Sequence, residues 1–141
     1  MKRKILVVDD EKDYESLINQ ALGVKKYFRE YKFIYSLTGN SAISMLKDYD
    51  DIDIAMLDIN MPDMDGLSLL KYIKSNYPNI QVIMVSAYND NANILLAMNA
   101  GAIDFVAKPI DIKNLENTLK KTINHSENIK LNIPYDQESP L

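Results

Sequence analysis

The fold is decided by residues 4–10, which read KILVVDD. A short continuous run of aliphatic side chains, stopped abruptly by acids, is typical of a strand that is covered on both faces of its sheet. Such strands occur in parallel sheets, where helices lie on either side. The stretch therefore predicts an α/β fold and places two carboxylates at the carboxyl end of a buried strand.

Similar apolar runs recur along the chain, and segments with helical spacing lie between them. The further runs cover residues 33–35, 52–57, 82–85 and 103–107, and the helical segments cover about 14–22, 42–46, 67–77, 94–98 and 115–123. Strands that alternate with helices of this length form a parallel sheet. We therefore predict a doubly wound five-stranded parallel sheet of order 2-1-3-4-5, a (βα)5 three-layer sandwich.

Composition restricts the chain to one domain and to few classes of function. The 141 residues suit a single core, and the absence of Cys excludes disulfides, thiolate metal sites and cysteine nucleophiles. A cytoplasmic location is the expectation for such a chain. A net charge of −4 argues against direct binding of nucleic acid by this segment. No apolar run is long enough to cross a bilayer, so no membrane association is expected.

The helical period fades near the carboxyl end of the sequence. We predict one domain over residues 1–124 and a mobile tail or linker over 125–141. The last ten residues, NIPYDQESPL, have no apolar period and contain two prolines.

Local signals predict how several helices begin. Asn40 or Ser41 is the expected N-cap of the second helix, and Asp111 is the expected N-cap of the fifth. Asp63 and Asp65 are interpreted as a polar turn before the third helix, because their spacing does not fit a calcium-binding loop.

Polar side chains stand at the ends of four predicted strands. The first strand ends in Asp9 and Asp10, the third in Asp58, the fourth in Ser86 and the fifth in Lys108. Ligands of doubly wound sheets bind at this edge, where the strand order reverses. Because the first and third strands are predicted neighbours, the three carboxylates should converge. Clustered carboxylates repel unless a cation joins them, and ligation by oxygen alone suits Mg²⁺.

Each of these side chains also has an ordinary structural explanation. Acids are common in solvated loops, a serine at a strand end is commonly a turn former, and a lysine beside acids can form a structural ion pair. An acid pair, a further acid, a hydroxyl and an ammonium group together favour a site that adds a phosphoryl group to a carboxylate.

Four motifs resemble those of bacterial two-component response-regulator receiver domains, in order and in spacing. They read VVDD at residues 7–10, LDINMPDMDG at 57–66, VSA at 85–87 and FVAKP at 105–109. The resemblance covers about residues 3–124 and implies the flavodoxin-like fold of that family. It also implies a phosphorelay function, in which a sensor histidine kinase or a phosphotransfer protein supplies the phosphoryl group.

The resemblance implies a role for each matching residue. Asp58 would be the phosphoacceptor, and Lys108 would pair with a phosphoryl oxygen. Asp10 and Asp58 would hold Mg²⁺, or Mn²⁺ in its place, directly. Asp9 would act largely through water, and the backbone carbonyl of Asn60 would complete the protein ligands.

The resemblance further implies a conformational switch. Ser86 would donate its hydroxyl to the phosphoryl group, and Phe105 would turn inward as Ser86 moves. The surface of the fourth helix, fifth strand and fifth helix would then control a downstream partner or output domain, and a homodimer could form through the same surface. The bond between Lys108 and Pro109 is expected to be cis.

Two positions are expected to tune dephosphorylation, and two others depart from the common pattern of the family. Asn60 and Tyr88 stand where the family tunes this rate, and the bulk of Tyr88 predicts restricted access of water. Ser86 replaces the commoner threonine, and Phe105 replaces a tyrosine. Both changes preserve the site and bear on the strength of the switch.

Other functions are compatible with the fold class. A flavin carrier needs a phosphate-cradling loop after the first strand, where this chain is acidic. A phosphohydrolase needs a second acid two residues after Asp58, where this chain has Asn60. We therefore expect this protein to catalyse only its own Mg²⁺-dependent phosphorylation and slow dephosphorylation. A receiver-like interaction module that is never phosphorylated remains the alternative.

Overall fold

Five parallel strands form the middle layer of the protein in a computed structural model, which describes residues 2–87 and 89–131. The strand order is β2-β1-β3-β4-β5, which confirms the predicted doubly wound topology. A short 3₁₀ turn, η1 (Lys26–Phe28), precedes the second strand. The strands are β1 (Arg3–Val8), β2 (Tyr31–Ser36), β3 (Ile52–Asp58), β4 (Gln81–Ala87) and β5 (Asp104–Lys108).

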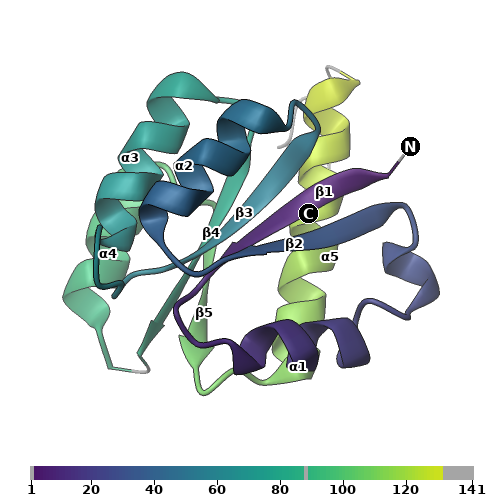
Figure 1. Cartoon of the computed structure of the whole chain (residues 1–141), viewed down its shortest axis with the longest axis horizontal. Coiled ribbons are helices and arrows are strands. Elements are labelled where there is room, and N and C mark those ends of the chain that lie inside the picture. The colour runs from purple at the N-terminus through teal and green to yellow at the C-terminus, as the bar shows by residue number, and fades with distance from the viewer. Residues whose placement is uncertain (1, 88, 132–141) are drawn as a thin grey trace, which may run out of the picture.

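Helices cover both faces of the sheet and give three layers (Figure 1). One face carries α2 (Gly39–Asp48), α3 (Gly66–Asn76) and α4 (Asn91–Asn99), and the other carries α1 (Asp13–Ala21) and α5 (Ile112–Lys130). Strands β1 to β4 contribute to both hydrophobic cores because successive side chains of a strand point to opposite faces, whereas β5 contributes Val106 to one core. This two-sided burial explains why the strands are aliphatic runs and do not alternate between apolar and polar residues.

The pairing register brings the ends of the central strands level with one another. Val8 of β1 pairs with Leu57 of β3. The next residues, Asp9 and Asp58, therefore lie side by side. Asp58 in turn pairs with Val85 of β4, directly before Ser86. Asp9, Asp58 and Ser86, which are far apart in the sequence, therefore lie at the same carboxyl edge of the sheet.

The N-cap of α2 differs from the prediction. Thr38 is the capping residue: its backbone is extended, and its side-chain oxygen accepts a hydrogen bond of 3.0 Å from the backbone N–H of Ser41. Asn40 and Ser41 are already helical, so neither has the extended backbone that an N-cap requires. Asp111 caps α5 as predicted, accepting a bond of 3.0 Å from the backbone N–H of Lys113.

The last helix extends beyond residue 124, where the predicted domain ends. It continues to Lys130, and Ser126 on its inner face is buried. Lys130 Nζ lies 2.5 Å from a carboxylate oxygen of Asp53, and Glu127 accepts a bond of 3.3 Å from Tyr31. Polar side chains make these contacts, so apolar periodicity did not reveal them. The remainder of the predicted tail, residues 132–141, lies outside the described residues.

Helix α4 is apolar without being deeply buried. Leu95 and Leu96 are 62% and 56% exposed, and within this helix Ala97 is the buried residue.

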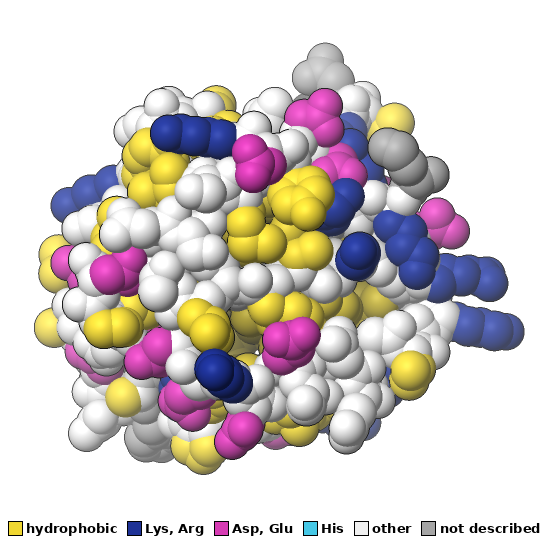
Figure 2. Space-filling view, in the orientation of Figure 1, with side chains coloured by type: hydrophobic (Ala, Val, Ile, Leu, Met, Phe, Trp, Pro, Cys, Tyr) yellow, Lys and Arg dark blue, Asp and Glu magenta, His cyan; other side chains and the backbone are white. Residues whose placement is uncertain are grey.

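Acidic, basic and apolar side chains are interspersed over the face shown in Figure 2. Across residues 2–87 and 89–131, no helix combines the length and the apolar character needed to span a bilayer.

Candidate functional site

Three aspartates converge at the carboxyl edge of the sheet. Asp9 and Asp10 follow β1, and Asp58 ends β3. One carboxylate oxygen from each lies within 4.8 Å of the other two. Asp9 and Asp58 are buried, whereas Asp10 is exposed. The geometry confirms that the three predicted carboxylates come together and gives them a shared side that is open to solvent at Asp10.

Lys108, at the end of β5, reaches across β4 to this cluster. Its Nζ lies 3.0 Å from Asp9 Oδ2 and 3.1 Å from Asp58 Oδ2. It also lies 3.1 Å from Glu11 Oε1, on the loop after β1. The side chain of Lys108 is 19% exposed, so the ammonium group is held inside the site by carboxylates on more than one side.

Backbone groups fix the second oxygen of each buried carboxylate. The N–H of Glu11 donates to Asp9 Oδ1 over 2.9 Å, and the N–H of Asn60 donates to Asp58 Oδ1 over 3.1 Å. Such bonds from an N–H two residues along the chain are typical of aspartate in turns. The two carboxylates are thereby oriented by their own loops.

Burial and hydrogen bonding shift the protonation equilibria of the site. Burial raises the pKa of Asp9, and the bonds from Glu11 N–H and Lys108 oppose this shift only in part. Burial by itself lowers the pKa of Lys108, but the bonds to Asp9, Glu11 and Asp58 outweigh it, so the pKa of Lys108 is raised. The ammonium group is therefore charged at neutral pH.

The donor set fits a hard divalent cation. Asp9, Glu11 and Asp58 contact one ammonium group, and Asp10 lies beside Asp9 and Asp58, so the site has an excess of negative charge. The burial that raises the pKa of Asp9 shows that the excess charge is poorly solvated. Oxygen ligands with an open, water-accessible side are the environment that Mg²⁺ prefers.

Ser86 and Phe105 lie on β4 and β5, outside the acid cluster. Ser86 is buried, and its hydroxyl makes long contacts of 3.4 Å with the carbonyl oxygen of Ala87 and 3.5 Å with Asp90 Oδ2. Phe105, on β5, is 39% exposed. The peptide bond between Lys108 and Pro109 is cis, which is the isomer that the resemblance implied. Tyr88 lies outside the described residues.

The loop between β3 and α3 is held by two acids and one glycine. Asp63 accepts bonds of 3.1 and 3.0 Å from the N–H groups of Gly39 and Asn40 at the start of α2, and Asp65 caps α3. The polar turn predicted for these acids is therefore also a pair of helix caps. Gly66 packs so closely that a Cβ there would lie 2.3 Å from the carbonyl oxygen of Asp58.

Two contacts of Lys108 were not predicted as parts of the site. One is the ion pair with Glu11, and the other places Lys108 Nζ 5.0 Å from the centre of the Tyr14 ring. Tyr14 lies in the first turn of α1 and packs against the hydrophobic core. The contact joins α1 to β5, and no local sequence signal indicated it.

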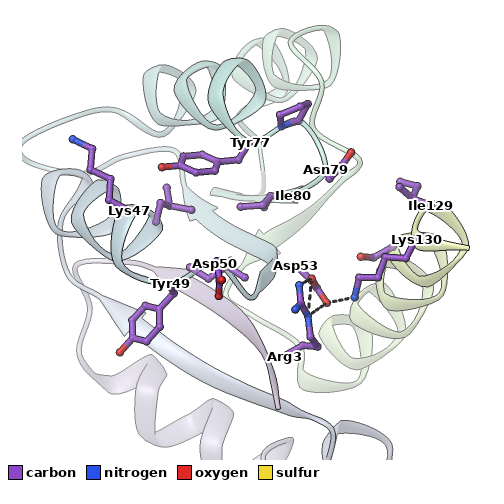
Figure 3. Close-up of a pocket in the computed structure, with 14 residues that line it drawn as sticks. Arg3, Lys47, Tyr49, Asp50, Asp53, Tyr77, Asn79, Ile80, Ile129 and Lys130 are labelled. Carbon is purple, nitrogen blue, oxygen red and sulfur yellow. Dashed lines mark hydrogen bonds and ion pairs between the residues drawn. The ribbon is translucent and has the colours of Figure 1, made fainter. Parts of the chain in front are cut away.

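A hollow of about 880 Å³ opens at the opposite edge of the sheet. Figure 3 shows it between Tyr49, Tyr77 and the group formed by Arg3, Asp53 and Lys130. Asp53 accepts from Arg3 Nη2 over 2.6 Å and from Lys130 Nζ over 2.5 Å. The carboxylate of Asp53 is thus fully engaged in joining β1, β3 and α5, and the acid cluster contributes nothing to this hollow.

Comparison with known proteins identifies the family. The family model described as the response regulator receiver domain matches residues 5–120. The chain belongs to the response-regulator receiver family. This finding confirms the resemblance drawn from the four sequence motifs. The flavodoxin-like topology is confirmed as well, by the strand order and by solved receiver domains.

Relatives with this domain are regulators of several kinds. The transcriptional regulatory protein ZraR of Escherichia coli K12 is 31% identical over 92% of this chain, and the DNA-binding transcriptional regulator NtrC of Proteus hauseri is 32% identical over 88%. A CheY-like receiver domain protein of Methanospirillum hungatei is 27% identical, with a TM-score of 0.79 over 90% of this chain and 98% of its own. This receiver chain spans 28% and 25% of the lengths of ZraR and NtrC.

Proposed function

We propose that this receiver accepts a phosphoryl group on Asp58 from a phosphohistidine of a sensor histidine kinase or of a phosphotransfer protein. An oxygen of the Asp58 carboxylate attacks phosphorus, so an O–P bond forms while the P–N bond breaks. The imidazole nitrogen keeps the electron pair of that bond and takes a proton from solvent. The observation that carries the proposal is the convergence of three aspartates with Lys108, whose Nζ lies 3.1 Å from Asp58.

The acid cluster supports a role for Mg²⁺ in this transfer. Asp10 and Asp58 would bind the ion directly, Asp9 largely through water, and the carbonyl of Asn60 would complete the protein ligands. A divalent ion here neutralises the negative charge that would otherwise repel the phosphoryl donor. Mn²⁺, which accepts the same oxygen ligands, would act in its place.

Lys108 supplies the positive charge that belongs to the protein itself. Its ammonium group is already bonded to Asp58, so a phosphoryl oxygen on that residue arrives within reach of the same N–H donors. Charge stabilisation of this kind requires no reorganisation at the moment of transfer. Asn60, and Tyr88 in the segment after β4, would set how fast water removes the phosphoryl group.

Phosphorylation would then switch the surface made by α4, β5 and α5. The hydroxyl of Ser86 makes only long contacts and Phe105 is partly exposed, so no short hydrogen bond holds Ser86 and Phe105 is not fully buried. Reversing a 1:99 population requires about 5.5 kcal/mol. Bonds from Lys108, Ser86 and loop amides to a doubly charged group, at about 1.5–3 kcal/mol each, suffice.

The exposed apolar side chains of α4 support a partner at this surface. Leu95 and Leu96 are exposed on α4, the helix that precedes β5 in the chain, and Phe105 is partly exposed on β5. A downstream protein, an output domain or a second copy of this receiver would bind there in a phosphorylation-dependent way. The protein would carry out this signalling in the cytoplasm, where sensor kinases present their phosphohistidine.

The test is incubation of the full chain with acetyl phosphate and Mg²⁺, followed by intact-mass measurement. We expect a gain of about 80 Da, the mass of one phosphoryl group, that disappears in Asp58→Asn. Asp53→Asn is the matched control, because Asp53 is a buried aspartate on the same strand that does not reach the cluster. No gain of mass at saturating donor and metal would favour the alternative, an interaction module that is not phosphorylated.

A further inference from the structure

Tyr14 places its ring beside the ammonium group of Lys108. The distance from Lys108 Nζ to the ring centre is 5.0 Å. This is inside the range of roughly 6 Å over which the face of an aromatic ring attracts a cation. Tyr14 lies in the first turn of α1, is partly buried and packs against the hydrophobic core on that face of the sheet.

The other contacts of Lys108 in the described structure are all carboxylates. Asp9, Glu11 and Asp58 lie 3.0, 3.1 and 3.1 Å from Nζ, which provides one acceptor for each N–H of the ammonium group. In the proposed function, Asp58 also binds a divalent cation directly and Asp9 binds it largely through water. Metal binding would therefore weaken two of these three bonds and would repel the ammonium group directly.

The attraction between the ring and the ammonium group does not use these oxygens. It depends on the electron density of the ring face, which neither a proton nor a metal ion on the carboxylates removes. A lysine side chain is a flexible four-carbon stem that turns to solvent when its partners are lost. Only the exposed carboxylate of Glu11 and the ring of Tyr14 remain to oppose this movement.

We propose that Tyr14 is a positioning residue, whose ring keeps the ammonium group of Lys108 facing Asp58 while a divalent cation occupies the acid cluster. The inference rests on the proposed function and adds a residue to it. The ring makes no contact with the transferred group. It acts by holding Lys108 where a phosphoryl oxygen on Asp58 arrives.

The first experiment measures exposure of the Lys108 amine and requires no phosphorylation. An amine-specific reagent is added to the full chain with and without saturating Mg²⁺, and the rate of modification at Lys108 is followed by peptide mass spectrometry. We expect Mg²⁺ to accelerate modification in Tyr14→Leu by about two- to fivefold more than in the wild type, the factor that corresponds to an exposed contact of this kind. Tyr14→Phe, which keeps the ring, should behave as the wild type does.

A matched control is available elsewhere in the chain. The ring of Tyr27 lies 5.0 Å from Lys120 Nζ, so Tyr27→Leu removes an equivalent contact away from the acid cluster. It should leave modification of Lys108 unchanged. Should Tyr14→Leu fail to fold, Tyr14→Met provides similar apolar volume without a ring.

The second experiment measures the rate of phosphorylation by acetyl phosphate at saturating Mg²⁺. Tyr14→Leu should be slower by a similar factor, and Tyr14→Phe should restore the rate. If the wild type and Tyr14→Leu show the same effect of Mg²⁺ on modification of Lys108 and the same rate of phosphorylation, the role of Tyr14 is overturned. A wild-type protein that gains no mass would instead refute the proposed function, and the modification rates would still decide the role of Tyr14.

Discussion

Replacement of Gly66 by alanine tests how closely the phosphoacceptor is tied to the loop that follows it. Gly66 is the first residue of α3, and its N–H donates to the carbonyl oxygen of Ile59 over 2.8 Å. An added Cβ would lie 2.3 Å from the carbonyl oxygen of Asp58 and 2.8 Å from the Cα of Ile59. Both obstacles are backbone atoms, so no side-chain rotation relieves the contact.

The size of the effect follows from these distances. Ordinary contact begins at 3.4 Å, so the backbone at Asp58 must move by about 1 Å. Overpacking of this kind costs about 1–3 kcal/mol of unfolding free energy. A displacement of about 1 Å at a reacting group can lower its rate by about 100-fold. We therefore expect Gly66→Ala to fold, to lose about 2 kcal/mol and to accept a phosphoryl group about 10- to 100-fold more slowly.

Urea denaturation measures the loss of stability, and the time course of mass gain with acetyl phosphate measures the rate. Ser68→Ala is the control, because Ser68 is exposed on the same turn and provides its backbone N–H, which alanine keeps, to Asp65 over 2.7 Å. A Gly66→Ala protein with the stability and the phosphorylation rate of the wild type would show that the loop adapts freely and that the packing argument is wrong.

Three further predictions concern charged side chains. Lys108→Ala should abolish the shift of the Phe105 ring signals that phosphorylation produces in NMR spectra, and a full shift would refute the proposed route from Asp58 to the surface. Asp53→Asn should lower the unfolding free energy by about 2 kcal/mol in urea, less than for a wholly buried pair because Arg3 and Lys130, 42% and 39% exposed, can turn to water. An unchanged midpoint would show that this ion pair adds no stability. Asp63→Asn should lower the melting temperature at pH 7. Bonds from two backbone N–H groups lower the pKa of Asp63, so its stabilisation is complete above its ordinary pKa of 3.8 and is lost as the pH falls through the lower, folded-state value. The melting temperatures of the wild type and of Asp63→Asn should therefore differ at pH 7 and converge as the pH falls into the acid range. A difference that persists in acid would contradict this cause.

Features that follow from local sequence and from sheet topology were predictable. The aliphatic run before Asp9 predicts a buried strand, and parallel strands bring their carboxyl ends to one edge. The meeting of Asp9, Asp10, Asp58 and Lys108 therefore follows from the order of the elements alone. Asp111 was also predictable as a cap, because it immediately precedes a helical segment whose start is clear.

Features that depend on contacts between distant polar groups were not predictable. Residues 125–130 continue α5 through polar contacts with Asp53 and Tyr31, which apolar periodicity does not register. The cap at Thr38 depends on where the backbone leaves its extended conformation. The contact between Tyr14 and Lys108 joins α1 to β5, and no local pattern in either segment indicates it.

The separation between the acid cluster and the hollow at the opposite edge has a practical consequence. Asn79 lies on the rim of that hollow and is exposed (Figure 3). Because the sequence contains no Cys, Asn79→Cys would introduce a unique thiol for a fluorescent dye or a surface linkage. A label at this position leaves the acid cluster at the carboxyl edge of the sheet unobstructed. The receiver could therefore be immobilised through the thiol of the Asn79→Cys variant and titrated with its phosphoryl donor.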